Sequence, residues 1–505
     1  MNAPFPQSAS ADIALLLEGT FPFVSGGVST WVNQLISGLP DYRFAVVFLG
    51  SRPTDYGEPS FTLPANLVHL EAHYLFAETD MPPVNTPRRR PGTSACLHEL
   101  HAALRAECPG GALPAMLQDI GFFFDPKKGL PLTEFLYGQD SWHYLTEMYE
   151  TRCTDPSFVD YFWTIRGMHL PIWRLAAIAR DLIPVRAYHT ISTGYAGLLG
   201  TLLHAHTGRP LLLSEHGIYT KERRIDLLNA PWVADRRSRL ERDPSEISYL
   251  RELWIAFFEA LGRMCYQAAH RTVALFPAAR ERQITDGADP ARSLIIPNGV
   301  EVTPFKALRS DRAASLARPV LCLLGRVTPI KDIKTFIRAM REVVDEMPDA
   351  RGLIVGPENE DPDYARECKN LVASLNLTDH VQFRGFQRID EVLPHIHLLV
   401  LSSISEGLPL VLLEGFAAGV PAISTDVGAC RELVYGSAND DLGPAGAVVG
   451  LADPRALGAA AVRLLRDPEA YRHAQAAAMA RVERDYTERL MFERYRSLYA
   501  EVCAL

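Results

Sequence analysis

The chain has 505 residues, which is more than a single hydrophobic core usually organises, so two domains are expected. Its composition, 48% hydrophobic and 22% charged, is that of a soluble globular enzyme, and a net charge of −9 argues against nucleic acid as a partner. The eight cysteines are scattered without a Cys-x-x-Cys spacing, which argues against a metal cluster and a disulfide framework.

The beginning of the sequence, residues 1–12, lacks the basic and apolar pattern of a cleavable targeting segment. No apolar run along the chain is long enough to span a bilayer. We therefore expect a cytoplasmic protein, and recruitment to the inner face of the membrane is compatible with that expectation.

Short apolar runs alternate with helical patterns through most of the first half. The runs that we expect to be strands are residues 13–17, 44–49, 67–70, 187–191, 210–213, 272–275 and 294–296. After the first of them, Gly26 and Gly27 form a glycine-rich loop, and Val28 and Val32 continue as the apolar face of a helix. Taken alone, such a loop is more often a tight turn than a binding site.

The pattern changes between residues 82 and 182, where a proline-rich basic loop precedes aromatic helical stretches. This segment is predicted to be a mostly helical insertion in the first domain. Within it, Arg88 to Arg90 form a charge run, which is usually a solvated loop, and we interpret it so. A long amphipathic helix is expected at residues 247–266.

The second half repeats the alternation after a polar, basic segment, residues 301–317, which is predicted to be a linker. Strands are expected at residues 320–324, 352–355, 381–383, 397–401 and 422–424, and helices at 332–344, 364–375, 389–393 and 487–502. Repeated β-α units with short loops imply a parallel, doubly wound sheet in each half, and such sheets bind ligands beyond the carboxyl ends of their strands.

A strand, a glycine-containing turn and a helix start follow one another across residues 398–419. Pro409 suits the first position of the helix, and a helix N-terminus at this place favours a phosphate group. Glu406 lies on the turn and Glu414 lies about one and a half turns into the helix. One carboxylate is thus available to the reacting end of a ligand and the other to its hydroxyl groups, as a nucleotide-sugar site requires.

A second loop, which follows the strand at residues 320–324, carries two cations. Arg326 comes directly after the strand, and Lys331 lies where the next helix begins. An Arg fork and a Lys point charge at the mouth of a parallel sheet suit a diphosphate. Each cation alone is also compatible with a surface residue that caps its neighbours, and the phosphate role is favoured because both accompany the Glu406 turn.

Three other places carry side chains that can do chemistry. His216 and His189 each end a strand, where a lone histidine is commonly structural, and the glycine after His216 opens its approach. Asp361 and Asp363 have the Asp-x-Asp spacing of metal-assisted sugar transfer, but the proline between them also fits a turn with a helix cap. We assign no metal to them.

Four motifs occur in one order along the chain: Gly26-Gly27-Val28, residues 296–300 (Ile-Pro-Asn-Gly-Val), Gly325-Arg326 with Lys331, and Glu406 to Glu414 in a Glu-x7-Glu arrangement. Together they resemble the retaining GT-B glycosyltransferases of family 4. The resemblance implies an α/β fold of the GT-B type, with two facing, doubly wound Rossmann-like domains, and a hexosyltransferase activity that needs no metal and no cofactor. Residues 18–28 and 214–223 are similar to one group within this family, the PelF family of Pel exopolysaccharide (biofilm) synthesis.

This resemblance implies domains at residues 1–300, with the insertion at 82–182, and 318–484, joined by a linker at 301–317. A C-terminal helix at 485–505 would cross back to the first domain. Implied partners are a UDP-sugar donor, with UDP-glucose the expected donor, a polysaccharide or oligosaccharide acceptor, and inner-membrane Pel synthase proteins. The insertion departs from the general family pattern, so ordinary members do not predict the acceptor.

The family's site residues carry over by position. Arg326 and Lys331 would neutralise the diphosphate, Glu414 would bind the ribose, and Glu406 would hold the donor sugar. The other residues that would bind the donor or line the reacting sugar are Gly26, Gly27, His216, Arg384, Phe386, Gly407, Leu408 and Pro409. Two other functions stay open, a UDP-sugar epimerase and a non-catalytic nucleotide-binding subunit of a membrane polysaccharide synthase.

Overall fold

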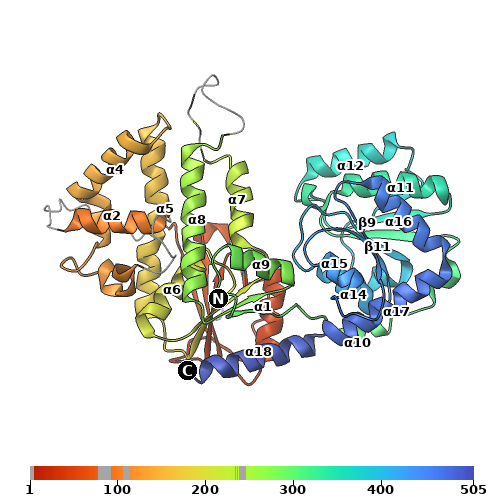
Figure 1. Cartoon of the computed structure of the whole chain (residues 1–505), viewed down its shortest axis with the longest axis horizontal. Helices are drawn as coiled ribbons and strands as arrows, with labels where there is room; N and C mark the ends of the chain where they lie inside the picture. The colour runs from red at the N-terminus through yellow and green to blue at the C-terminus, as the bar shows by residue number, and fades with distance from the viewer. Residues whose placement is uncertain (1–4, 78–91, 106–113, 234, 236, 238–245) are drawn as a thin grey trace. The chain divides into compact units, whose positions relative to one another are not determined.

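The computed structural model of the chain describes residues 5–77, 92–105, 114–233, 235, 237 and 246–505. The chain divides into two compact units, the first made of Met1–Ile295 with Arg496–Leu505 and the second of Ile296–Tyr495 (Figure 1). Both units are built on a parallel sheet. The basic run at residues 88–90, predicted to be a solvated loop, lies outside the described residues.

The sheet of the first unit has the order β3-β2-β1-β4-β5-β6-β7, and all its described pairs are parallel. Its strands are β1 (Ile13–Glu18), β2 (Phe44–Gly50), β3 (Leu67–Tyr74), β4 (Ala187–Thr190), β5 (Leu211–Glu215), β6 (Arg271–Ala274) and β7 (Ser293–Ile295). The strands β1 and β2 are continuous apolar runs and are almost fully buried, as expected for a parallel sheet that is covered on both faces.

Helices connect these strands. The helices of the first unit are α1 (Gly27–Gly38), α2 (Thr93–Leu104), α3 (Leu132–Tyr137), α4 (Gln139–Arg152), α5 (Phe158–Asp181), α6 (Tyr195–Thr207), α7 (Tyr219–Asn229), α8 (Tyr249–Ala268) and α9 (Pro277–Thr285). Short 3₁₀ turns are η1 (Pro53–Asp55), η3 (Ala115–Gln118) and η4 (Ile120–Phe123). The helix α6 is buried nearly all round because it packs against α5, α8 and β1.

The predicted helical insertion is confirmed: α2, η3, η4, α3, α4 and α5 all lie between β3 and β4 in sequence, and α2, α4 and α5 lie together in space (Figure 1). Aromatic side chains fill its core. The ring of Trp173 stacks on Phe135 with centroids 4.4 Å apart, and its indole N–H donates to the Leu130 carbonyl at 2.8 Å. This buried tryptophan on α5, with its N–H satisfied, fixes α3 and the segment before it against α5.

The sheet of the second unit has the order β10-β9-β8-β11-β12-β13 and is parallel throughout its described pairs. Its strands are β8 (Val320–Leu324), β9 (Arg351–Val355), β10 (Val381–Phe383), β11 (Leu398–Leu401), β12 (Ala422–Thr425) and β13 (Gly446–Val449). The edge strand β13 was not predicted. Its sequence, Gly-Ala-Val-Val, is apolar, but the strand has only four residues and is half-buried at the edge of the sheet.

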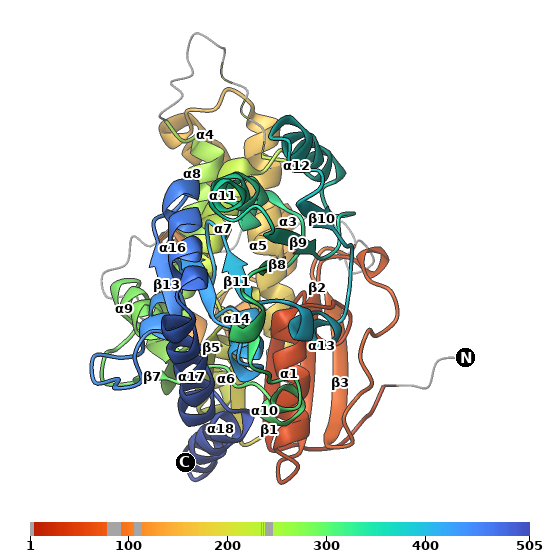
Figure 2. The same cartoon turned by 90° about the vertical axis from the view of Figure 1, so that its right-hand side faces the viewer.

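Helices cover this sheet too. The helices and 3₁₀ turns of the second unit are α10 (Val302–Lys306), η5 (Arg312–Ser315), η6 (Pro329–Lys331), α11 (Ile333–Glu346), α12 (Pro362–Ser374), α13 (Ile389–Val392), η7 (Leu393–His395), α14 (Leu410–Ala417), α15 (Cys430–Tyr435), α16 (Pro454–Arg466) and α17 (Pro468–Asp485). The chain then continues into α18 (Glu488–Cys503), which the two units share. In α11, Ile333, Phe336, Ile337 and Met340 are buried at helical spacing, and the helix packs against α16 (Figure 2).

The prediction of a linker at residues 301–317 is wrong. This segment contains α10 and η5 and belongs to the second unit, which begins at Ile296. Arg312 is only 3% exposed, and its guanidinium donates to the carbonyls of Ile396 at 3.1 Å and Ala418 at 2.9 Å. The charge that made the segment look solvated is therefore buried and hydrogen-bonded.

The C-terminal helix α18 belongs to both units, since Arg496–Leu505 is counted with the first. Within the first unit, the Tyr499 hydroxyl lies 2.7 Å from Nδ1 of His189, and Nε2 of that histidine lies 2.8 Å from the Ser214 hydroxyl. His189 is thus a buried structural histidine. None of the helices in the described part of the chain combines the length and hydropathy that a membrane span requires.

Candidate functional site

The predicted phosphate loops meet at the carboxyl ends of β8 and β11 in the second unit. The N–H of Ile404 donates to the Ile330 carbonyl at 2.9 Å. The Ser402 hydroxyl lies 2.9 Å from the carbonyl oxygens of both Lys331 and Asp332. The loop after β8 and the turn before α14 are therefore fixed to each other, at the edge of a parallel sheet where ligands bind.

Lys331 and Glu406 form an ion pair in which Nζ lies 2.6 Å from Oε1. The Lys331 side chain is 22% exposed and the Glu406 side chain 12% exposed. The Ser403 hydroxyl also donates to Oε1 of Glu406. Because the pair is mostly shielded from water, its charges act over a short distance with little screening.

Arg326, the other predicted cation, pairs with Glu360 and not with Glu406. Its Nη1 donates to both carboxylate oxygens of Glu360, at 2.7 and 2.8 Å. The two side chains are 55% and 48% exposed. An exposed pair of this kind contributes little to stability and exchanges partners readily. Its guanidinium is accordingly accessible to an anionic ligand.

The helix α14 begins at Leu410, so the prediction that Pro409 is its first helical residue is wrong by one position. Pro409 has extended ψ and is the N-cap, which leaves the first N–H groups of the helix directed beyond the strand. The turn before it rests on Gly428, whose φ is +54° and where an added Cβ would lie 2.1 Å from the Gly407 carbonyl oxygen. The same carbonyl accepts the Ala429 N–H at 2.9 Å, so close backbone packing holds the turn.

Glu414 lies one turn into α14, and burial raises the pKa of its carboxyl to about 7. Near neutral pH this group exists in both protonation states. In its carboxylate form this group accepts hydrogen bonds on both oxygens, which suits the hydroxyl groups of a ribose.

Two further predicted residues, Arg384 and Phe386, follow β10 at the edge of the same sheet. The Phe386 ring is 78% exposed and Arg384 is exposed as well. An aromatic ring in water at the carboxyl end of a strand is available for stacking.

The predicted residues of the first unit lie at the starts of α1 and α7. Gly26 is the N-cap of α1, and a Cβ added to Gly26 or Gly27 would meet no described atom within 4 Å, so packing does not require glycine there. His216 follows β5, and its ring contacts Trp31 edge-on with centroids 4.3 Å apart. All three residues lie beyond the carboxyl ends of strands of the first sheet.

Asp361 is the N-cap of α12, where its carboxylate accepts the Tyr364 N–H at 3.0 Å. Asp363 is exposed and pairs with Arg366 at 2.7 Å. The Asp-x-Asp spacing is therefore occupied by a helix cap and a surface ion pair.

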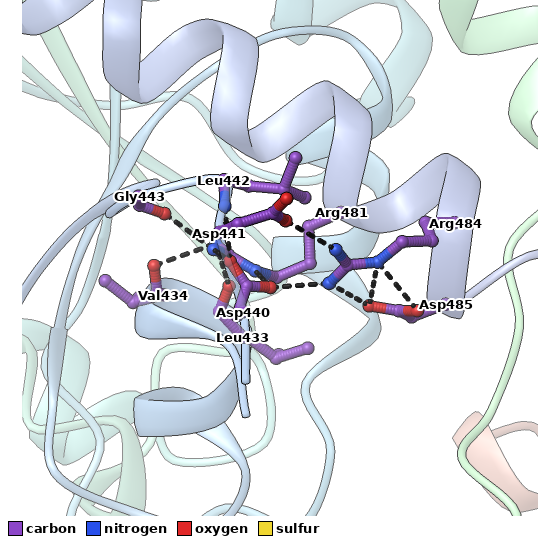
Figure 3. A network of polar contacts seen from close by, with 9 residues as sticks. All are labelled: Leu433, Val434, Asp440, Asp441, Leu442, Gly443, Arg481, Arg484 and Asp485. Carbon is purple, nitrogen blue, oxygen red and sulfur yellow. Dashed lines mark hydrogen bonds and ion pairs between the residues drawn. The ribbon is translucent and has the colours of Figure 1, made fainter. Parts of the chain in front are cut away.

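A buried polar network that was not predicted supports the site from behind. Arg481 on α17 pairs with Asp440 at 2.9 Å, and both side chains are 1% exposed (Figure 3). The same guanidinium donates to the carbonyls of Leu433 at 3.2 Å and Val434 at 2.9 Å, at the end of α15. Ala429, the residue before α15, donates its N–H to the Gly407 carbonyl in the turn before α14. By holding α15 in place, the network therefore also helps to hold that turn.

Sequence reasoning also missed Glu360 and the two serines, Ser402 and Ser403. The serines lie within the motif that drew attention to Glu406, and their short hydroxyls before a turn were the available signal. Glu360 gives no local signal, because it meets Arg326 only through the fold.

The structure is similar over nearly its whole length to solved GT-B proteins, which confirms the predicted fold. Anabaena HepE in complex with UDP has a TM-score of 0.58 at 14% identity and covers 97% of this chain and 100% of its own. Sucrose-phosphate synthase from Thermosynechococcus elongatus has a TM-score of 0.58 at 17% identity and covers 98% and 99%. The chain is thus a two-domain α/β protein of the GT-B fold.

Within that fold, the chain belongs to the family described as "Domain of unknown function (DUF3492)", whose model matches residues 11–291, more than half of its 505 residues. Residues 318–467 match the model described as "Glycosyl transferases group 1". Particular kinship with the PelF family stays a prediction.

Two curated relatives resemble the chain in sequence. D-inositol 3-phosphate glycosyltransferase of Kineococcus radiotolerans is 33% identical over 238 residues, which is 43% of this chain and 53% of the relative. N-acetyl-alpha-D-glucosaminyl L-malate synthase of Bacillus anthracis is 29% identical over 196 residues, 39% and 49% respectively. The matched part spans about half the length of each relative.

Proposed function

We propose that the protein is a glycosyltransferase that moves a hexose from a UDP-sugar, with UDP-glucose as donor, to a saccharide acceptor with retention of configuration and without a metal ion. Support comes from the group 1 model that matches the second unit and from relatives named as glycosyltransferases. Structural neighbours were solved with UDP and with UDP-glucose.

The observation that carries the proposal is the Lys331–Glu406 pair, 2.6 Å long, at the start of α14. It places a shielded cation, a carboxylate and a helix N-terminus together at one sheet edge. The cation and the helix N-terminus suit a diphosphate, and the carboxylate can accept hydrogen bonds from the hydroxyl groups of the sugar attached to it. A plain surface ion pair would not be shielded in this way.

In the proposed reaction, the bond between the anomeric carbon and the diphosphate oxygen breaks, and its electron pair leaves with UDP. Lys331, Arg326 and the first N–H groups of α14 would stabilise the charge that develops on the leaving oxygen. An acceptor hydroxyl would attack from the same face, form the new C–O bond, and give its proton to the departing phosphate.

The other predicted residues have supporting roles in this proposal. Glu414 would bind the ribose, and Glu406 would hold the sugar with the N–H groups of Gly407 and Leu408. Phe386 and Arg384 would receive the base, and Gly26, Gly27 and His216 of the first unit would approach the reacting sugar.

We further propose that the product is an exopolysaccharide of the Pel type, made at the cytoplasmic side with inner-membrane synthase proteins. Residues 18–28 and 214–223, which resemble the PelF family, support this assignment. The helical insertion between β3 and β4 is the part of the chain in which an acceptor or partner preference would differ from that of other GT-B proteins.

The proposal is tested with the purified full chain, UDP-glucose and oligosaccharide acceptors. We expect UDP release that depends on the acceptor, together with a new glycoside whose anomeric proton has the configuration of the donor by NMR. Conversion of UDP-glucose to a second UDP-sugar without acceptor would identify an epimerase instead. UDP binding with no turnover of any UDP-sugar would identify a non-catalytic subunit.

A further inference from the structure

A cavity of about 360 Å³ lies in the first unit, beyond the carboxyl ends of β1, β2 and β3. Its walls come from α6, α7, α8 and the segment after α7, and they are mainly aromatic. The volume falls within the usual range of small-molecule sites, about 300–1,000 Å³. Its principal lining residues are Tyr56, Tyr195, Tyr219, Trp232, Trp254 and Phe258.

Two charged side chains face this cavity. Glu18, at the end of β1, accepts the Tyr219 hydroxyl at 3.0 Å, and the Arg223 guanidinium donates to the same hydroxyl at 3.0 Å. Arg223 Nη2 lies 3.7 Å from the Glu18 carboxylate, so the charges nearly balance. Nε of Arg223 is buried and has no hydrogen-bond partner among the described residues.

This polar group is held by the fold. The Glu18 carboxylate accepts the Ala196 N–H at 3.3 Å, at the start of α6. Gly194 makes room for it, because an added Cβ there would lie 2.4 Å from the Tyr219 hydroxyl and 2.6 Å from Oε2 of Glu18. The acid and the phenol are thus set in place before any ligand arrives.

The aromatic wall presents one ring to water. Trp232 is 63% exposed, and its ring meets Trp254 edge-on with centroids 5.4 Å apart. Trp254 in turn stacks on Phe258 at 5.9 Å, and the Arg223 guanidinium lies over Phe258 at 4.9 Å. Buried neighbours therefore orient an indole whose own surface is free for contact.

We propose that this cavity binds a neutral sugar ring of the acceptor saccharide, an assignment that rests on the proposed transferase function. A pyranose has an apolar C–H face that suits an indole, and hydroxyl groups that donate to a carboxylate and accept from a guanidinium. An anionic ligand is disfavoured because Glu18 offsets the charge of Arg223. The site lies within residues 11–291, the part of the chain that the DUF3492 model matches.

The test measures the binding of maltotriose, cellotriose and chitotriose to the full chain by calorimetry, without donor. We expect at least one trisaccharide to bind. Trp232→Ala should weaken that binding about tenfold, as the loss of one aromatic contact predicts. Trp163→Ala is the matched control, because Trp163 on α5 is 62% exposed and does not line the cavity, and it should bind as the wild type does.

Arg223→Lys is a second variant, which keeps the charge and loses the fork, and it should also weaken binding. Failure of all three trisaccharides to bind, or wild-type affinity in Trp232→Ala, would overturn the proposal. UDP affinity is measured on the same variants and should not change. Trisaccharide binding at the cavity without any sugar transfer would refute the transferase function alone, whereas transfer with no binding at the cavity would refute this inference alone.

Discussion

Replacing Lys331 with alanine tests the proposed diphosphate site most sharply among single substitutions. Nζ of Lys331 lies 2.6 Å from Glu406, in a pair whose side chains are 22% and 12% exposed. The substitution removes a shielded cation and leaves a carboxylate whose remaining described hydrogen bond comes from Ser403. That uncompensated carboxylate would repel the diphosphate, so both donor binding and turnover should suffer.

The expected loss follows from this shielding. A preorganised donor at a developing charge is worth about 10²–10³-fold in kcat when water is excluded from it. The Lys331 side chain, at 22% exposed, is largely shielded from water. We therefore expect Lys331→Ala to lower kcat by about 10²-fold or more and to raise KM for the UDP-sugar.

The assay is steady-state UDP release at saturating acceptor. Lys334→Ala is the matched control, since Lys334 on α11 also pairs at 2.6 Å, with Glu367, but that partner is 60% exposed. The control should keep activity within about twofold, as expected for an exposed pair. In the double variant Lys331→Ala/Glu406→Gln, donor binding should partly recover relative to Lys331→Ala. Wild-type kcat in Lys331→Ala at saturating donor would refute the role.

Three further predictions concern the second unit. Arg326→Ala should lower kcat by about tenfold, which is less than Lys331→Ala, because the Arg326 side chain is 55% exposed and already pairs with Glu360. A larger loss of steady-state UDP release in Arg326→Ala than in Lys331→Ala would contradict this. The affinity for UDP-glucose should fall by up to about tenfold per pH unit below pH 7. The reason is that the Glu414 carboxyl has a pKa of about 7 in the free protein and must lose its proton to accept hydrogen bonds from the ribose hydroxyls. Calorimetry on Glu414→Gln should show weaker binding that lacks this dependence on pH. Asp440→Asn should cost about 3–5 kcal/mol of unfolding free energy by urea titration, since it leaves Arg481 buried without its counter-charge. Hydrogen bonding to Arg481 depresses the pKa of Asp440, so the stability that this carboxylate contributes to the wild type should be lost as pH falls below about 4. If the unfolding free energy of Asp440→Asn fell equally steeply in acid, the prediction would be contradicted.

Apart from β13, the strands of both sheets were predictable because buried parallel strands are continuous apolar runs, as in β1 and β11. The helix α7 was not predicted, because its charged, mostly exposed sequence has only two buried residues, Thr220 and Leu227. The segment at residues 301–317 was wrongly predicted to be a linker because Arg312, one of its charged residues, is buried although the sequence indicates exposure. Its charges indicated solvent, and the burial of Arg312 depends on carbonyl groups that lie about a hundred residues away.

The loops of the candidate site were predictable as local motifs, since a strand, a glycine turn and a helix start leave a pattern in the sequence. Their partners were not. The pairing of Lys331 with Glu406 joins two loops 75 positions apart, and that of Arg326 with Glu360 spans 34. The aromatic cavity of the first unit is built from Glu18, Tyr219 and Trp254, which only the fold brings together.

A crystal of the full chain soaked with UDP tests the central claim most directly. The account predicts the diphosphate within about 3.2 Å of Lys331 Nζ and of the first N–H groups of α14, with the ribose at Glu414. A nucleotide bound in the first unit's aromatic cavity, or anywhere away from Lys331 and Glu414, would contradict it.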